Sequence, residues 1–244
     1  MNTKRLVSWL AVSALTASAG IASLSNAAET TPVNSQNLIV AELFTSQSCS
    51  SCPPAEALFA ELADQENLLT IEWHVDYWDT LVHGGSKWKD RYSDRDYTAR
   101  QRSYNAALRG TRAVYTPQAV INGQLEEAGN RRHAVSDMLA NAPDLSVPVQ
   151  IKNNTVTVGA AQADLDVLFV RLLEQHETDV KGGENKGRKL HGKNIVLEAQ
   201  VLGQTGNSAV EYKLPSVGQG ETCAVLIQSI DNKVGPVLGA AKCG

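Results

Sequence analysis

The sequence of 244 residues predicts an α/β domain followed by a smaller, antiparallel β-sandwich-like domain. Three observations lead to this prediction. Strand-like and helix-like patterns alternate over residues 38–142, and a Cys-x-x-Cys motif falls between the first strand and the first helix. From Leu145 onward, apolar residues recur at every second position, as in half-buried strands. We place the domains at residues 37–142 and 145–244, after a leader at residues 1–27.

The composition excludes one class of partner. Hydrophobic residues make up 43% of the chain and charged residues 20%, which is typical of a globular protein with a core. The 22 Lys and Arg residues are outnumbered by 26 Asp and Glu residues, and no long basic run occurs. A phosphate backbone would therefore meet no basic patch, and nucleic acid is not an expected partner.

The N-terminus has the pattern of a secretory signal peptide. Lys4 and Arg5 precede an apolar stretch over residues 6–24, and small residues follow as far as Ala27. An uncleaved membrane anchor is the alternative, but the Ser and Thr residues within the stretch argue against it. We expect cleavage near Ala27 and a periplasmic or secreted protein without a membrane span. In such an oxidising compartment an even number of cysteines favours disulfides.

The elements of the first domain follow in chain order. Residues 38–44 form a short apolar run typical of a buried strand, and residues 68–75 form a second one. Between them a helix begins at the second cysteine of the motif, where Pro53 and Pro54 suit the first turn. A strand–helix–strand unit of this kind predicts a parallel pair of strands.

A second helix and a hairpin complete this domain. Ser93 and Asp96 resemble a capping box and Gly110 a stop signal, which predicts a helix over residues 94–109. Residues 116–127 read as two short strands joined by Asn-Gly, and a third helical spacing ends before Pro143.

The remaining strands are predicted from their period of two. They cover residues 147–151, 156–158, 165–169, 195–201, 224–227 and 234–238. The polar run over residues 177–193 is expected to be a long loop. Its glycine-rich part, Gly183 to Arg188, lacks the strand-to-helix setting of a phosphate loop, so we expect neither nucleotide binding nor another cofactor.

Cys49 and Cys52 are the strongest candidates for chemistry. Cys49 is expected at or just before the N-terminus of the first helix, where backbone N–H groups and the helix dipole favour a thiolate and make it a nucleophile. Cys52, one turn later, can attack the mixed disulfide that Cys49 forms with a substrate. Two alternatives remain open: a structural disulfide in a non-redox adaptor, or a thiolate site for a metal such as copper(I), with His74 as third ligand.

Cys223 and Cys243 have a simpler assignment. A turn near Lys233 would place these two cysteines directly opposite each other on neighbouring antiparallel strands. We therefore predict a structural disulfide that closes the C-terminal hairpin.

His74 is a candidate site residue because of its place in the second predicted strand. It leaves the strand at the carboxyl end, where α/β sheets bind their ligands, and Asp76 two positions on is expected to orient it near the thiolate.

The motif at the first helix and the dipeptide Thr116-Pro117 before the hairpin resemble the thioredoxin fold over residues 38–140, and the hairpin is similar to the glutaredoxin form. Longer phrases resemble a secreted bacterial family known as domain of unknown function 1223 across nearly the whole mature chain. These phrases are Glu42 to Pro54, His74 to Asp79, Tyr115 to Gln118 and Gly183 to Arg188.

The thioredoxin resemblance implies further site residues. Pro117 is expected to be cis, which would present the backbone of Thr116 to an extended substrate. Glu42 is expected to be a buried carboxyl group that relays a proton to Cys52, with an edge-facing or capping carboxylate as the alternative. The resulting hypothesis is a thiol–disulfide oxidoreductase acting on a protein or a small thiol; the sequence carries no signal for its oligomeric state.

Overall fold

The computed structural model describes residue 1, residues 38–229 and residues 234–243. Residues 2–27 of the predicted signal peptide and the predicted turn at Lys233 therefore lie outside the described residues. Within the described part of the chain, no helix combines the length and the hydropathy needed to cross a membrane.

The first half of the chain forms the elements that the sequence predicts. Strands β1 (Ile39–Thr45) and β2 (Leu68–His74) are parallel and are joined by helix α1 (Pro53–Leu62). Pro residues occupy the first two positions of α1, where a missing N–H group leaves no helical hydrogen bond unmade. Helix α2 (Arg95–Leu108) begins at Asp94, whose side chain accepts a hydrogen bond from the backbone N–H of Asp96.

A hairpin and a third helix follow. Strands β3 (Gln118–Ile121) and β4 (Leu125–Ala128) pair antiparallel, and α3 (Arg132–Ala140) comes after them. The turn contains Asn122 and Gly123, both with positive φ (47° and 65°), which explains the Asn-Gly dipeptide.

The second half of the chain is made of strands. In order these are β5 (Val149–Lys152), β6 (Thr155–Val158), β7 (Asp166–Asp179), β8 (Lys189–Gln204), β9 (Val210–Lys213), β10 (Glu221–Gln228) and β11 (Val237–Lys242). The prediction of a long loop over residues 177–193 was wrong, because β7 and β8 extend as a paired hairpin and only residues 180–188 connect them. The sequence prediction also missed β9, which pairs with β6.

The sheet topology corrects the expectation of a separate β-sandwich. Eight strands form one mixed sheet in the order β11-β10-β7-β8-β2-β1-β3-β4, and β5, β6 and β9 form a second, three-stranded sheet. The junction is the parallel contact of β2 with β8, where Glu72 pairs with Ile195. Strands from both halves of the chain thus share one sheet, because β8 covers the free edge of β2 that the first half alone would leave exposed.

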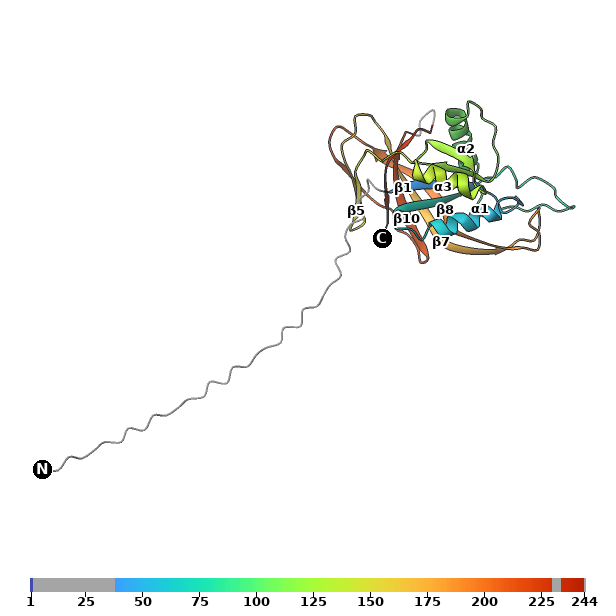
Figure 1. Ribbon diagram of the computed structural model, residues 1–244, viewed down its shortest axis with the longest axis horizontal. Helices are drawn as coiled ribbons and strands as arrows, with labels where there is room; N and C mark the ends of the chain where they lie inside the picture. Colours follow the sequence, from blue (N-terminus) through green and yellow to red (C-terminus); the bar gives the residue numbers. More distant parts are fainter. Residues whose placement is uncertain (2–37, 230–233, 244) are drawn as a thin grey trace. The chain divides into compact units, whose positions relative to one another are not determined.

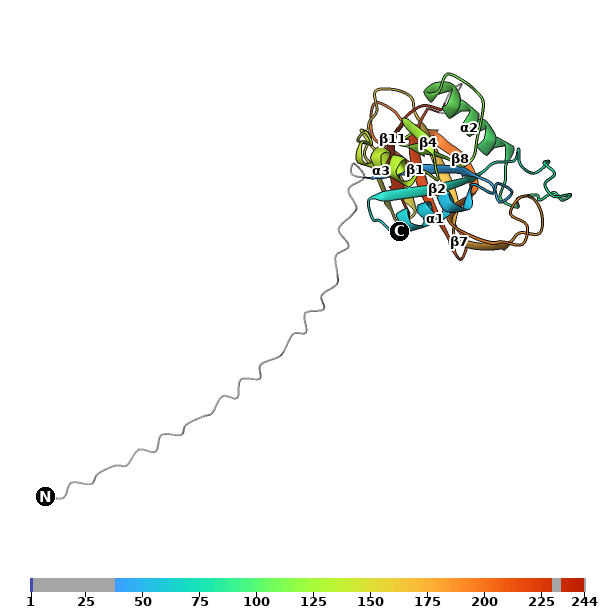
Figure 2. The ribbon, with the colours of Figure 1, turned by 45° about the vertical axis from the view of Figure 1, so that its right-hand side comes forward.

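Helices and the small sheet cover the two faces of the large sheet (Figures 1 and 2). Alternate residues of β1 divide between the faces: Ala41 and Leu43 pack with α1 and α3, whereas Val40 and Phe44 belong to the core beneath α2. The three-stranded sheet packs against β7, β10 and β11 through a third apolar cluster. The carboxyl ends of β1 and β2, and the loops that follow them, form the candidate site.

Candidate functional site

Cys49 and Cys52 form a disulfide at the start of α1. Cys52 is the N-cap residue of the helix, and its carbonyl accepts hydrogen bonds from the backbone N–H groups of Ala55 and Glu56 at 2.8 and 3.1 Å. The disulfide is almost covered: Cys49 is 1% exposed and Cys52 fully buried, while Ser50 and Ser51 between them are exposed. The motif therefore lies at the helix N-terminus, as the sequence predicts.

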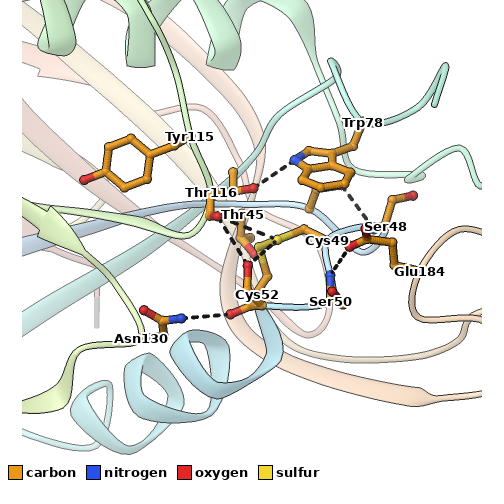
Figure 3. Close-up of a disulfide and its surroundings, with 12 residues drawn as sticks. Thr45, Ser48, Cys49, Ser50, Cys52, Trp78, Tyr115, Thr116, Asn130 and Glu184 are labelled. Atoms are coloured by element: carbon orange, nitrogen blue, oxygen red, sulfur yellow. Dashed lines mark hydrogen bonds between the residues drawn. A yellow bond between two sulfur atoms is a disulfide. The ribbon is translucent and has the colours of Figure 1, made fainter. Parts of the chain in front are cut away.

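Two polar groups face the sulfur of Cys49 (Figure 3). The carbonyl oxygen of Thr116 lies 3.8 Å from the Cys49 Sγ, and the hydroxyl of Ser51 lies 3.2 Å from the same atom. Trp78 lies beside them and donates a hydrogen bond from its Nε1 to the Thr116 hydroxyl at 2.8 Å. The Thr116–Pro117 peptide bond is cis, as the resemblance implies.

Glu42 does not lie on the side of the sheet where the disulfide is found. Its side chain is fully buried towards α2, where it accepts hydrogen bonds from the Arg100 Nε at 2.7 Å and from the Tyr104 hydroxyl at 2.5 Å. Gln228 joins this network through Arg100 and Tyr104. The predicted relay from Glu42 to Cys52 is therefore wrong: the alternation of β1 places Glu42 on the α2 face and Thr45 on the α1 face.

His74 is buried, but its partner is not the one expected. Its Nδ1 lies 2.7 Å from the Oδ2 of Asp90, whereas Asp76 accepts a hydrogen bond from Thr98. Burial disfavours the imidazolium, but the charge and hydrogen bond of Asp90, together with Glu72, outweigh it and raise the pKa of His74 to about 10. The raised pKa favours the imidazolium form of His74, which lies in a buried acidic cluster with Asp90 and Glu72.

Glu56 is the buried carboxyl group nearest to the motif along the chain, and sequence reasoning missed it. Its Oε1 accepts a hydrogen bond from the hydroxyl of Thr45 at 2.6 Å, and Figure 3 shows Thr45 beside Cys52. Burial and the neighbouring carboxylate of Glu72 raise the pKa of Glu56 to about 8. A signal was present, because Glu56 follows Cys52 by four positions and so shares its face of the helix.

The connection between β7 and β8, residues 180–188, lies against the loop that carries Cys49; we call it the hairpin loop. Asn185 is fully buried and donates from its Nδ2 to the carbonyl oxygens of Gln47 and Cys49 at 3.0 and 2.8 Å. Glu184 accepts a hydrogen bond from the backbone N–H of Ser50 at 2.8 Å. The glycine-rich phrase in the sequence marked this loop, but no local pattern identified Gln47, Cys49 and Ser50 as the residues it contacts.

Two remaining predictions concern disulfides and metals. Cys223 and Cys243 form a disulfide between β10 and β11, whose register runs symmetrically about Lys233 from Ala224 opposite Lys242 to Ile227 opposite Gly239. Among the described residues, no group of three or more His, Cys, Asp or Glu side chains has the geometry of a metal site. The metal alternative took His74 as its third ligand, and the Nδ1 of His74 lies 2.7 Å from the Oδ2 of Asp90.

These features define a class: a mixed sheet flanked by three helices, with a disulfide at a helix N-terminus and a second disulfide in the C-terminal hairpin. The family model described as "Protein of unknown function (DUF1223)" matches residues 40–228, and the chain belongs to that family. The chain is also similar to a crystal structure of an Agrobacterium tumefaciens protein from a structural genomics consortium, at 29% identity and a TM-score of 0.70. That match covers 84% of this chain and 93% of the other. A comparison with curated proteins gives no match.

Proposed function

We propose that this protein is a thiol–disulfide oxidoreductase of an oxidising, extracytoplasmic compartment, built on a thioredoxin-like first half. The observation that carries the proposal is the place of Cys49 and Cys52: their disulfide spans the loop and N-cap of α1, with the Thr116 carbonyl 3.8 Å from the Cys49 Sγ. The two disulfides support the compartment, since reducing compartments rarely preserve them.

The position of Cys49 suits a nucleophile. At the start of a helix the backbone N–H groups and the helix dipole stabilise negative charge, which lowers the pKa of a cysteine there below its free value of about 8.5. Once the disulfide is reduced, the Ser51 hydroxyl, 3.2 Å from the Cys49 Sγ, can donate a hydrogen bond to the thiolate. Cys49 is thus the sulfur that exchanges with the substrate.

In the reducing direction, the Cys49 thiolate attacks a substrate disulfide. A Cys49–substrate disulfide forms and the other substrate sulfur leaves as a thiolate. Cys52 then loses its proton and attacks the Cys49 sulfur, which releases the second substrate thiolate and forms the Cys49–Cys52 disulfide. The substrate disulfide gains two electrons and the dithiol loses two; the oxidising direction is the reverse.

Glu56 is our candidate for the group that takes the proton from Cys52. It is linked to Thr45 by a 2.6 Å hydrogen bond, and its backbone N–H donates to the Cys52 carbonyl. A carboxyl group whose pKa is raised to about 8 by burial and Glu72 exchanges a proton readily near neutral pH. Glu56 therefore takes over the role that the sequence assigned to Glu42.

The test is the equilibrium reduction potential of the Cys49–Cys52 pair, titrated against glutathione in a Cys223→Ser/Cys243→Ser background. A catalytic pair is expected between roughly −270 and −120 mV. A value below roughly −300 mV, or a pair that glutathione does not reach, would identify a structural disulfide and support the adaptor alternative. In that case Cys49→Ser and Cys52→Ser would lower stability without loss of any exchange activity.

A further inference from the structure

The hairpin loop brings one acidic side chain to the motif. Glu184 accepts a hydrogen bond through its Oε2 from the backbone N–H of Ser50 at 2.8 Å, and Ser50 directly follows Cys49. Figure 3 shows Glu184 beside this amide at the edge of the disulfide loop. The hydrogen bond from Ser50 lowers the pKa of Glu184, so the side chain is a carboxylate at neutral pH.

The hairpin loop is held in place independently of Glu184. Asn185, fully buried, bridges the carbonyl oxygens of Gln47 and Cys49, and Gly183 leaves so little room that an added Cβ would lie 2.9 Å from the Ser48 hydroxyl. On the outer side, the Glu184 Oε1 lies 3.3 Å from the Nδ1 of His83. These two contacts hold the carboxylate beside the Ser50 amide, at an exposed position next to the motif.

Three of the residues at the start of α1 offer no free backbone N–H group. Pro53 and Pro54, the first two residues of α1, have no N–H group to offer. The N–H of Cys52 donates to the Cys49 carbonyl at 3.2 Å. The amide of Ser50, the residue after Cys49, is thus paired with a carboxylate, which places a negative charge near the positive end of the helix.

We propose that Glu184 is a positioning residue that limits the stability of the Cys49 thiolate and thereby makes the Cys49–Cys52 couple more reducing. The physical reason is that the disulfide is neutral while the reduced form carries the thiolate, so a neighbouring carboxylate penalises only the reduced form. This inference rests on the proposed function, because it assumes that the pair exchanges. It assigns regulation of the redox poise to the second half of the chain.

The experiment replaces Glu184 by Gln in the Cys223→Ser/Cys243→Ser background. Gln keeps the shape and an acceptor for the Ser50 amide but removes the charge. Glu177→Gln is the matched control, because Glu177 lies in the same hairpin and pairs with Lys189 and His191 of that hairpin. Glu184→Lys places a positive charge at the same position, and thermal unfolding verifies that each variant is folded.

Two quantities are measured: the thiol pKa of Cys49, from the pH dependence of its alkylation rate, and the equilibrium constant with glutathione. We expect Glu184→Gln to lower the thiol pKa of Cys49 by about half a unit or more, given the size of charge effects at helix termini. The equilibrium constant should shift about threefold towards the reduced form, which is about 14 mV for a two-electron couple. Glu184→Lys should shift both quantities further, and Glu177→Gln should change neither.

The outcomes separate the two claims. If the wild-type pair exchanges with glutathione but Glu184→Gln and Glu184→Lys leave the thiol pKa and the equilibrium constant unchanged, the role of Glu184 is refuted and the proposed function stands. If Glu177→Gln shifts them equally, the effect is one of overall charge and the inference is also refuted. If the wild-type pair does not exchange at all, both proposals fall.

Discussion

Substitution of Glu42 by Gln separates a structural role from a catalytic one. Glu42 is fully buried and accepts two short hydrogen bonds, from Arg100 at 2.7 Å and from Tyr104 at 2.5 Å. Gln can still accept from Tyr104, but it leaves the buried guanidinium of Arg100 without its counter-charge. Breaking a buried ion pair from one side costs roughly 3–5 kcal/mol, and we expect about 3 kcal/mol for this conservative change.

The assay is urea and thermal unfolding followed by circular dichroism, together with the rate of exchange of the Cys49–Cys52 pair with glutathione. For a chain of this size, about 3 kcal/mol corresponds to a melting temperature lower by roughly 6–12 °C. The exchange rate of the folded protein should stay within about twofold of wild type, since Glu42 faces α2 and not the disulfide. Glu198→Gln is the control, because Glu198 pairs with Arg171 at the surface, where an ion pair contributes about 1 kcal/mol or less.

If Glu42→Gln lowered the free energy of unfolding by less than about 1 kcal/mol, the role of Glu42 as the counter-charge of Arg100 would be refuted. A strong fall in exchange rate at unchanged stability would refute it in another way, because it would restore Glu42 as the proton relay that the sequence suggested.

Three further predictions concern the opposite face of the sheet and the second disulfide. Because the pKa of Glu56 is raised to about 8, its protonated form stabilises the fold at low pH, and this stabilisation is lost as the pH rises from about 4.5 through 8. The urea midpoint of the wild type should therefore fall between pH 5, 6.5 and 8, and Glu56→Gln should reduce this fall. Cys223→Ser/Cys243→Ser should lower the unfolding free energy by about 3 kcal/mol, because the unfolded chain regains the entropy that the disulfide removes by closing a loop with a sequence separation of 20. The Cys49–Cys52 pair should still exchange with glutathione. Gly192→Ala should lower the free energy of unfolding by about 1–3 kcal/mol in the same assay, because the added Cβ would lie 2.6 Å from the Glu72 Oε2. Unchanged stability would show that the Glu72 side chain moves aside without a measurable loss.

Local sequence patterns were sufficient to predict the helices and strands of the first half of the chain. The apolar run at residues 38–44, the prolines after Cys52 and the Asn-Gly turn each act within a few residues, and each appears in the structure as β1, α1 and the β3–β4 hairpin. The Cys223–Cys243 disulfide was also predictable, because antiparallel pairing about a nearby turn is a local matter. Residues 177–193 of the long hairpin, by contrast, were predicted as a loop because their side chains are mostly polar. The strands there are stabilised by pairing with each other, which the local composition does not indicate.

The place of the Cys-x-x-Cys motif at a helix start could be predicted from local patterns, because helix signals and turn chemistry depend on neighbouring residues. The surroundings of the motif come from parts of the chain that are distant in sequence. The contact of β2 with β8 joins the two halves of the chain and brings Glu184 and Asn185 to the motif across more than a hundred residues. The direction of each side chain in β1 likewise assigns Glu42 to Arg100 and Thr45 to Glu56. Such partners depend on strand order and sheet face, which no local pattern encodes.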